Sequence, residues 1–377
     1  MSSSLLQKGF EVELFTGQPS GENVGVSTAV AQEIPGFVTE PDHRNLEYIT
    51  DPIQDYDVLR EALLTPRRAL RRWLQPKGLT LLPGSTLSLG DNTQFERSNP
   101  DNPYHGRIEE TYGTRVVTAS IHINLGLDDA DLLFAAVRLV RCEAALYLAL
   151  SASSPFLGGQ VSAYHSQRWQ QFPLTPSAVP LFLDHAHYTS WVLEQLEAGT
   201  MWNERHLWTS VRPNGPRRPY ELNRLELRIC DLVTDPAELL AITALLELRL
   251  QQLIQNPEQF DPLVSSSLDA EQLMALADAN DAAAARDSLN ATLRHWGNGE
   301  TIRCDDWVNS LIDQVGPLAA DLDLSEHLQR LTAMVSAGNQ AMQWVDQHRA
   351  GRSISDLLRS GAEAMEHQEQ ALSPSLG

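Results

Sequence analysis

Alternating hydrophobic and polar residues mark four short segments of the chain as β-strands. In segment 9–15, apolar residues alternate with Glu11 and Glu13. Successive side chains of a strand point to opposite faces, so the two glutamates share one face. The alternation recurs in segments 44–50, 120–126 and 225–231. Their polar positions hold Glu47, His122, Asn124, Glu226 and Arg228. The pattern predicts one sheet whose polar face is a functional site.

Helical periodicity and shorter apolar runs predict the other elements before residue 236. The predicted helices cover 54–75, 128–151 and 181–198, and the further strands cover 79–82, 116–125, 204–211 and 222–231. We expect Pro66 to interrupt the first helix, because proline lacks the N–H of a helical hydrogen bond. Segments 84–105 and 156–180 are rich in Gly, Pro and polar residues. We expect them to be loops that border the site as mobile covers.

The pattern changes after Pro236. The predicted helices there cover 237–256, 268–296, 302–317, 324–348 and 352–371, and no segment alternates as a strand would. We therefore predict two parts, a sheet domain over 1–236 and an all-α lobe over 237–377 packed on it.

Charge and composition narrow the possible functions. The 377 residues carry a formal net charge of −21, which argues against nucleic acid or an anionic membrane as the main partner. Lysine occurs only at Lys8 and Lys77, so the chain has no G-x-x-x-x-G-K-[ST] phosphate-binding loop. The three cysteines lack C-x-x-C spacing, and no secretory signal pattern or long apolar run is present. We expect a reduced, cytoplasmic protein.

The polar face offers chemistry for cations and for anions. Carboxylates on alternate residues of a strand lie about 7 Å apart and, with an imidazole, suit divalent cations. Arg228 suits an anionic substrate, as do Arg168 and Arg212 in or beside Gly- and Pro-rich loops. Asn124 on the same face has an amide for hydrogen-bonding a substrate. The alternatives are a solvated strand face, an ordinary ion pair between Glu226 and Arg228, and a structural role for His122.

Several motifs resemble those of a known enzyme family. They are Gly-Phe-Glu-Val-Glu-Leu-Phe (9–15), Asn-Leu-Glu-Tyr-Ile-Thr (45–50), Ile-His-Ile-Asn-Leu-Gly (121–126), Leu-Ala-Leu-Ser-Ala-Ser-Ser-Pro-Phe-Leu-Gly-Gly (148–159) and Leu-Glu-Leu-Arg-Ile-Cys-Asp (225–231). In this order they resemble the glutamate–cysteine ligases and related carboxylate–amine ligases, closest to the bacterial and cyanobacterial branch. The resemblance covers about residues 8–236.

The resemblance implies an α+β fold like that of glutamine synthetase, with a curved antiparallel sheet forming a funnel. It implies ATP as co-substrate, L-glutamate and L-cysteine as substrates, and Mg²⁺ or Mn²⁺ at the sheet. The metal ligands that it implies are Glu11, Glu13, Glu40, Glu47, His122 and Glu226. Arg228 and Glu11 are implied as catalytic residues, Arg228 by stabilising the transferred phosphate. Pro41 after Glu40 departs from the family pattern.

Three other functions fit the same residues. One is ligation to an amine other than cysteine, because no motif identifies the acceptor pocket. The second is a non-catalytic regulator that binds nucleotide and metal. The third is a magnesium-dependent phosphotransferase or phosphatase.

Overall fold

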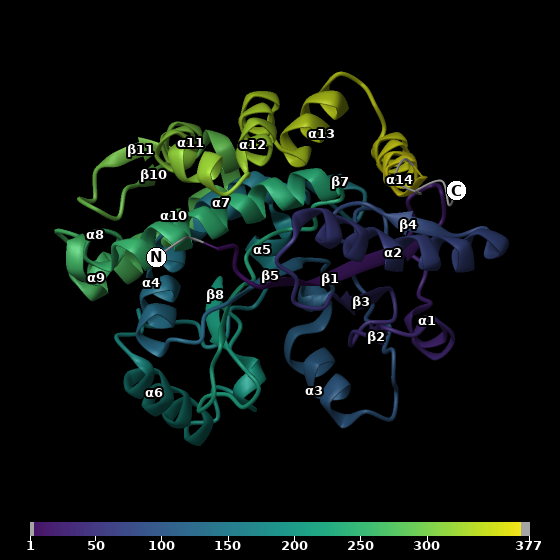
Figure 1. Ribbon diagram of the computed structural model, residues 1–377. Coiled ribbons are helices and arrows are strands. Elements are labelled where there is room, and N and C mark those ends of the chain that lie inside the picture. The colour runs from purple at the N-terminus through teal and green to yellow at the C-terminus, as the bar shows by residue number, and fades with distance from the viewer. Residues whose placement is uncertain (1–3, 371–377) are drawn as a thin grey trace.

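A mainly antiparallel β-sheet forms the centre of the computed structural model, which describes residues 4–370 (Figure 1). Within these residues seven strands pair in the order β2-β3-β1-β5-β9-β8, and β4 pairs with the end of β1. The strands are β1 (Lys8–Gly17), β2 (Phe37–Thr39), β3 (Asn45–Ile49), β4 (Thr80–Leu82), β5 (Ile121–Gly126), β8 (Val211–Asn214) and β9 (Arg224–Leu227). The predicted α+β class with a large antiparallel sheet is confirmed. The curvature of the sheet into a funnel stays a prediction.

The register of the strands separates an apolar face from a polar face. Phe10, Val12 and Leu14 of β1 are at most 3% exposed, as are the apolar residues of β5 and β9 that extend the same face, Ile121, Ile123, Leu225 and Leu227. This face packs on helices, among them α4 (Ala130–Ser151), which is buried along most of its length. The polar residues are thereby confined to the opposite face, as the alternation predicts.

The helices before residue 236 follow the predicted spans with several corrections. They are α1 (Ser27–Glu33), α2 (Tyr56–Leu74), α3 (Pro103–Tyr112), α4, α5 (Gln167–Gln171) and α6 (His185–Glu197). The predicted interruption at Pro66 is wrong, because α2 continues through it. The Tyr48 hydroxyl donates a hydrogen bond to the Leu63 carbonyl at 2.8 Å. It thus satisfies a carbonyl three residues before the proline, next to the one left without its helical donor.

Two predicted strands and the two long loops also need correction. The strand predicted over 116–125 begins only at Ile121, after a 3₁₀ turn over Gly113–Val116. The strand predicted over 204–211 is a 3₁₀ turn over Glu204–His206, and β8 starts at Val211. The predicted loop 156–180 contains the hairpin of β6 (Phe156–Leu157) and β7 (Gln160–Val161) as well as α5, and α3 begins inside 84–105. Their role as mobile covers stays a prediction.

The segment after Pro236 is mostly helical, but it also contains strands. Its elements are α7 (Pro236–Gln255), α8 (Pro257–Phe260), α9 (Pro262–Ser265), α10 (Ala270–Asp287), β10 (Thr292–Arg294), β11 (Thr301–Arg303), α11 (Cys304–Asp321), α12 (Ser325–Ala337), α13 (Gln340–Arg349) and α14 (Ile354–Gln370). The β10–β11 hairpin corrects the expectation of an all-α lobe. The helix predicted over 324–348 is two helices separated at Gly338, whose φ of +79° suits glycine.

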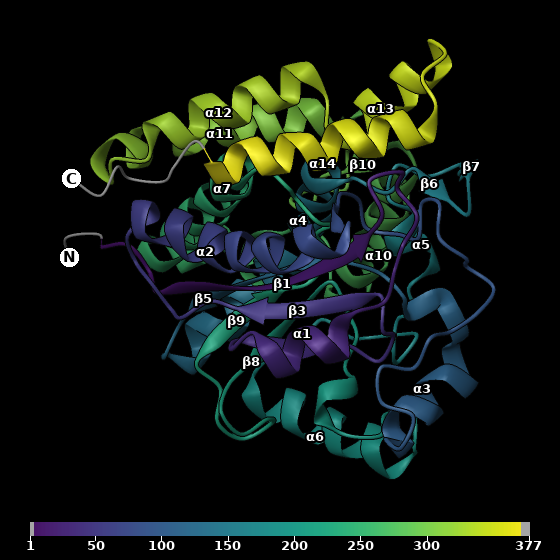
Figure 2. The same cartoon turned by 90° about the vertical axis from the view of Figure 1, so that its right-hand side faces the viewer.

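The C-terminal helices lie on one side of the sheet, as Figures 1 and 2 show. In Figure 2, α2 lies above β1, and α11, α12 and α14 form a further layer above it. One cluster of buried apolar residues runs from the sheet through α4 and α7 to α11 and α12. The division into parts 1–236 and 237–377 stays a prediction. No helix among residues 4–370 is long and apolar enough to cross a membrane.

Candidate functional site

The register of the sheet aligns the polar residues from strand to strand. Glu13 of β1 lies opposite Glu47 of β3, and Glu11 lies opposite His122 of β5. Farther along, Asn124 of β5 and Arg212 of β8 both lie opposite Glu226 of β9. Residues directly opposite on antiparallel strands have Cβ atoms about 4.5–5.5 Å apart, so they interact. The polar face therefore forms one continuous network.

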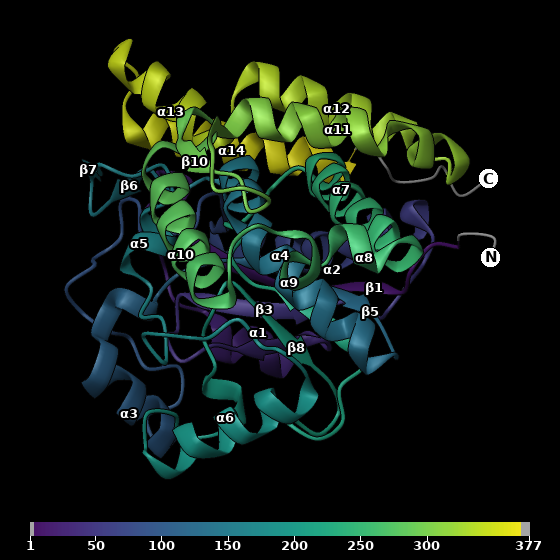
Figure 3. The same ribbon diagram turned by 90° about the vertical axis from the view of Figure 1, so that its left-hand side faces the viewer.

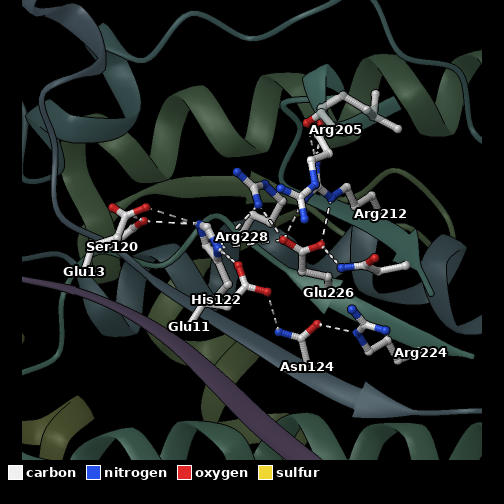
Figure 4. Close-up of polar contacts among 12 residues, drawn as sticks. Glu11, Glu13, Ser120, His122, Asn124, Arg205, Arg212, Arg224, Glu226 and Arg228 are labelled. Carbon is white, nitrogen blue, oxygen red and sulfur yellow. Dashed lines mark hydrogen bonds and ion pairs between the residues drawn. The ribbon is translucent and has the colours of Figure 1, made fainter. Parts of the chain in front are cut away.

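Hydrogen bonds connect the centre of this network (Figure 4). His122 Nδ1 lies 2.8 Å from Glu11 Oε2, and the Asn124 amide donates to Glu11 Oε1 at 3.3 Å. Arg224 Nε donates to Asn124 Oδ1 at 3.1 Å. On the other side, the Ser120 hydroxyl donates to Glu13 Oε2 at 2.8 Å and lies 3.2 Å from His122 Nε2. Burial and the Glu226 charge act to raise the pKa of Glu11, but the His122 hydrogen bond and the Arg228 charge outweigh them and lower it.

Three carboxylates gather beside this network. One oxygen each of Glu13, Glu40 and Glu47 lies within 4.8 Å of the other two. Glu40 directly follows β2, and the pairing of β2 with β3 brings it to Glu47. Pro41 therefore does not remove Glu40 from the cluster. In the described part of the chain, no side chain donates a hydrogen bond to the Glu40 or Glu47 carboxylate, and no Lys, Arg or His pairs with either.

Burial and mutual repulsion perturb this carboxylate cluster. Burial, together with the charges of Glu13 and Glu11, raises the pKa of Glu40 to about 8. Burial and the neighbouring Glu40 and Glu13 charges raise the pKa of Glu47 to about 10. Carboxylates crowded without a cationic partner hold protons that a divalent cation can replace. Oxygen ligands of this kind suit Mg²⁺, so the cluster fits a divalent cation.

Glu226 is fully buried and already accepts hydrogen bonds at both oxygens. Arg212 Nε and Nη2 donate to its two oxygens at 2.8 and 3.0 Å. The Asn214 amide donates to Oε2 at 2.6 Å, and Arg228 Nη1 donates to Oε1. Burial opposes ionisation, but the Arg212 and Arg228 charges hold the pKa of Glu226 well below its usual range. Glu11, His122 and Glu226 also each offer one atom within 4.8 Å of the others. These three, however, are engaged with one another and with arginines.

The carboxylate cluster and the arginines line one cavity of about 700 Å³. Of the predicted residues, it is lined by Glu11, Glu13, Glu40, Glu47, His122, Arg168, Arg212 and Arg228. Asn124 instead lines an adjoining cavity of about 480 Å³, which Glu11 and Arg224 also border. Glu226 lines neither of these two cavities and lies buried beside them. The structure therefore brings most of the predicted residues to one cavity, and their roles as ligands and catalysts stay predictions.

The two candidate substrate-binding arginines differ in how many donors they have left. Arg212 is held by Glu226 and by the Arg205 and Leu207 carbonyls, which occupy most of its N–H groups. It is therefore placed to position Glu226. Arg168 donates to the Ile229 and Arg228 carbonyls, while its buried Nε has no hydrogen-bond partner among the described residues. This free donor makes Arg168 the better candidate for a substrate anion.

Sequence reasoning missed other polar residues of the cavity. Asn45 and Arg218 line it, and Asn45 Oδ1 and Arg218 Nη1 are buried and have no hydrogen-bond partner among residues 4–370. Such atoms are costly to leave unpaired, so they indicate places where a ligand binds. Ser120 was also missed, although its period-2 relation to His122 and Asn124 could have identified it. Arg218 lies in a Pro-rich turn without periodicity, and no local pattern points to it.

Comparison with known proteins assigns the chain to a family. The model of glutamate–cysteine ligase family 2 matches residues 7–370, and the chain belongs to this family. A protein of Gloeobacter violaceus with the provisional name glutamate–cysteine ligase 2 is 25% identical over 356 residues, covering 90% of this chain and 91% of that protein. A similarly named protein of Frankia casuarinae is 25% identical and covers 95% of this chain and 94% of its own length.

Solved structures share the fold. The crystal structure of a glutamate–cysteine ligase from Francisella tularensis in complex with AMP has a TM-score of 0.77 at 12% identity. That alignment covers 99% of this chain and 90% of the Francisella chain. A bifunctional glutathione synthetase from Pasteurella multocida has a TM-score of 0.74 at 16% identity, covering 97% of this chain and 53% of that one. At these identities the likeness concerns the fold.

Proposed function

We propose that this protein is an ATP- and magnesium-dependent ligase that joins the γ-carboxylate of L-glutamate to the amine of L-cysteine. The products are γ-glutamylcysteine, ADP and phosphate. One observation carries the proposal: the unpaired carboxylates Glu40 and Glu47 share a cavity with Arg168 and Arg228. A reaction between a cation-bound nucleotide and a substrate carboxylate needs carboxylates that bind the cations and arginines that bind the anionic groups. Membership of glutamate–cysteine ligase family 2 supports the same choice.

The first step is phosphoryl transfer from ATP to the substrate carboxylate. A γ-carboxylate oxygen attacks the terminal phosphorus, the bond to ADP breaks, and an acyl phosphate forms. Such transfer depends mainly on positioning and on neutralising phosphate charge. Glu13, Glu40 and Glu47 would hold divalent cations, which would supply much of that neutralisation. Arg228 adds a fixed positive charge within the same cavity.

The second step forms the amide. The neutral amine of the acceptor attacks the acyl carbon, the bond from carbon to the phosphate oxygen breaks, and phosphate leaves. The amine nitrogen gives up a proton to the departing phosphate or to water as the amide forms. Because phosphate is the leaving group, the reaction needs no nucleophilic side chain of the protein. The cysteines agree with this, since burial raises the pKa of Cys230 to about 12 and keeps its thiol protonated.

The free polar atoms of the cavity give each substrate a place in this proposal. Arg168 Nε is proposed to bind the α-carboxylate of glutamate, and Asn45 Oδ1 can accept a hydrogen bond from its ammonium group. We place the nucleotide base in the adjoining cavity, because Glu11 borders both cavities. The AMP in the Francisella tularensis enzyme supports a nucleotide on this fold.

A different acceptor amine is the second candidate, and one feature of the cavity favours it. Tyr104, Phe172 and Trp208 line the cavity together with Ile108 and Val116. Aromatic and aliphatic walls of this kind suit an acceptor with a larger apolar side chain than cysteine. The chemistry is unchanged in that case, and only the amine differs.

The test is the amine dependence of ADP release. The protein is incubated with ATP, Mg²⁺ and L-glutamate, each amino acid is added in turn, and ADP and the amide product are measured. Cysteine should give the highest kcat/KM. If an aromatic or branched amine exceeds cysteine, the second candidate replaces the first. If no amine raises ADP release, the ligase proposal fails. Glu47→Gln should lose turnover, whereas Glu194→Gln on the exposed surface of α6 should keep it.

A further inference from the structure

A separate cavity, distinct from the two that adjoin each other at the candidate site and called the second cavity below, lies behind the aromatic wall of that site. Its volume is about 250 Å³, and it is lined by residues of α4, α5, the segment 172–179, Trp208–Thr209 and α10. Figure 3 shows α5 and α10 beside each other on this side of the molecule. Phe172 and Trp208 line both cavities. This cavity plays no part in the reaction proposed above.

One end of this second cavity carries an unbalanced set of charges. Arg141 of α4 donates to Asp281 Oδ2 at 3.1 Å and pairs with Asp278 through its other nitrogen. Two carboxylates thus share one guanidinium. Asp281 is 4% exposed, and its Oδ1 accepts no hydrogen bond from the residues that the structure describes. A buried carboxylate oxygen without a donor is costly, so Asp281 Oδ1 has room for a further donor.

The rest of the second cavity is mostly apolar. Trp169 of α5 lines it together with Phe172 and Trp208, whose ring centroids lie 5.2 Å apart. Leu174, Pro176 and Val179 extend this surface. Aromatic faces attract cations as well as apolar groups. The volume is just below the roughly 300 Å³ at which sites for drug-sized ligands begin, so it suits a small molecule.

We propose that this second cavity binds a small organic ammonium ion with an aromatic or aliphatic body. The ammonium group donates a hydrogen bond to Asp281 Oδ1, and the body packs against Trp169, Phe172 and Trp208. The ligand thereby supplies the missing donor and balances the second carboxylate. An anion is disfavoured, because Arg141 already pairs with both Asp278 and Asp281.

Isothermal titration calorimetry with 2-phenylethylamine tests this proposal, and 2-phenylethanol is the neutral control of the same shape. Burial raises the pKa of Asp281 to about 7, while Arg141 and Asp278 are the charged groups that face it. The titration is therefore made at about pH 8, where the carboxylate is ionised and the amine is protonated. The amine should bind saturably and at least about tenfold more tightly than the alcohol, because a charge-assisted hydrogen bond adds to the shared apolar contact.

Two variants locate the binding. Asp281→Asn keeps the shape and should weaken amine binding about tenfold while leaving alcohol binding unchanged. Ala282→Trp, at an exposed residue of the cavity lining, should abolish the binding of both, and Ala279→Trp on the exposed side of α10 should alter neither. If Asp281→Asn does not fold, the proposal is tested by the preference of the wild type for the amine over the alcohol and by the variants Ala282→Trp and Ala279→Trp. Absence of saturable amine binding, equal affinity for the alcohol, or amine binding that survives Ala282→Trp would overturn the proposal.

Discussion

Replacing Glu47 with Gln should stabilise the metal-free protein at neutral and alkaline pH. Burial and the Glu40 and Glu13 charges raise the pKa of Glu47 from 4.5 to about 10. The unfolded chain releases this proton near pH 4.5, whereas the folded chain keeps it until about pH 10. Between these values the unfolded state binds fewer protons, so wild-type stability falls as the pH rises. Glutamine does not titrate, so the variant escapes this loss.

The structure sets the size of this effect. One pKa unit corresponds to about 1.4 kcal/mol, so the roughly 3.5 units between pH 4.5 and about 8 give an upper bound of about 5 kcal/mol. Glu47 lines a large cavity, where water and side-chain relaxation reduce the repulsion. We therefore expect Glu47→Gln to raise the free energy of unfolding by about 1–2 kcal/mol at about pH 8 and by about zero at about pH 4. For a chain of 377 residues, 1 kcal/mol changes Tm by only about 1 °C.

Urea denaturation at these two pH values is therefore the better assay. With a chelator present, the variant should unfold at a higher urea concentration than wild type at about pH 8, but not at about pH 4. Added Mg²⁺ should stabilise wild type more than the variant, because the cation relieves repulsion that the variant lacks. Glu194→Gln is the control at an exposed residue. If the variant and wild type unfold in the chelator at the same urea concentration at both pH values, and Mg²⁺ stabilises the variant as much as wild type, the argument from crowded charges is refuted.

Three further substitutions test the rest of the network. Glu226→Gln should destabilise the fold by about 3 kcal/mol with or without Mg²⁺, because Arg212 and Arg228 then face no charged acceptor. Urea denaturation in chelator and in Mg²⁺ measures the loss of stability. Arg228→Lys should lower kcat about 10²-fold with a smaller change in KM, because lysine lacks the planar set of donors that we propose to bind the phosphate. Steady-state measurements of ADP release give kcat and KM separately. Ser120→Ala should cost about 1 kcal/mol of stability and about tenfold in turnover, since Glu13 and His122 lose their shared partner; Ser190→Ala on α6 is the matched control.

Strand periodicity was enough to predict the polar face of the sheet. Glu11 and Glu13 of β1 and Glu226 and Arg228 at β9 each lie two residues apart, and a strand must place such pairs on one face. This prediction did not require knowing how the strands pair with one another. The strand order decides which strands are neighbours, and the register decides which residues face each other. Only the structure shows that Glu13 faces Glu47 and that Glu11 faces His122.

Features that depend on distant contacts were not predictable from the sequence. The helix α2 continues through Pro66, and a tyrosine from β3 donates to the Leu63 carbonyl beside the one that the proline leaves without a donor. Nothing within the helix sequence records that contact. The β10–β11 hairpin lies in a segment of helical composition, and each strand has only three residues. Arg218 and Asn45 come from a turn and from a strand end, and only the fold brings these two residues to one cavity.

The contacts of Glu226 connect cation binding with the use of Arg228. Two N–H groups of Arg212, one of Asn214 and one of Arg228 fill the acceptor positions of this carboxylate, so a cation can bind Glu226 only where a donor leaves. Arg212 contacts both oxygens and is held by two backbone carbonyls, whereas Arg228 makes one hydrogen bond to Glu226. Asn214 also makes one hydrogen bond to Glu226, so Arg228 and Asn214 are the two donors that can each leave by breaking a single hydrogen bond. In the proposed reaction, a cation at Glu226 that took the place of Arg228 would release this arginine toward the phosphate that it is proposed to stabilise.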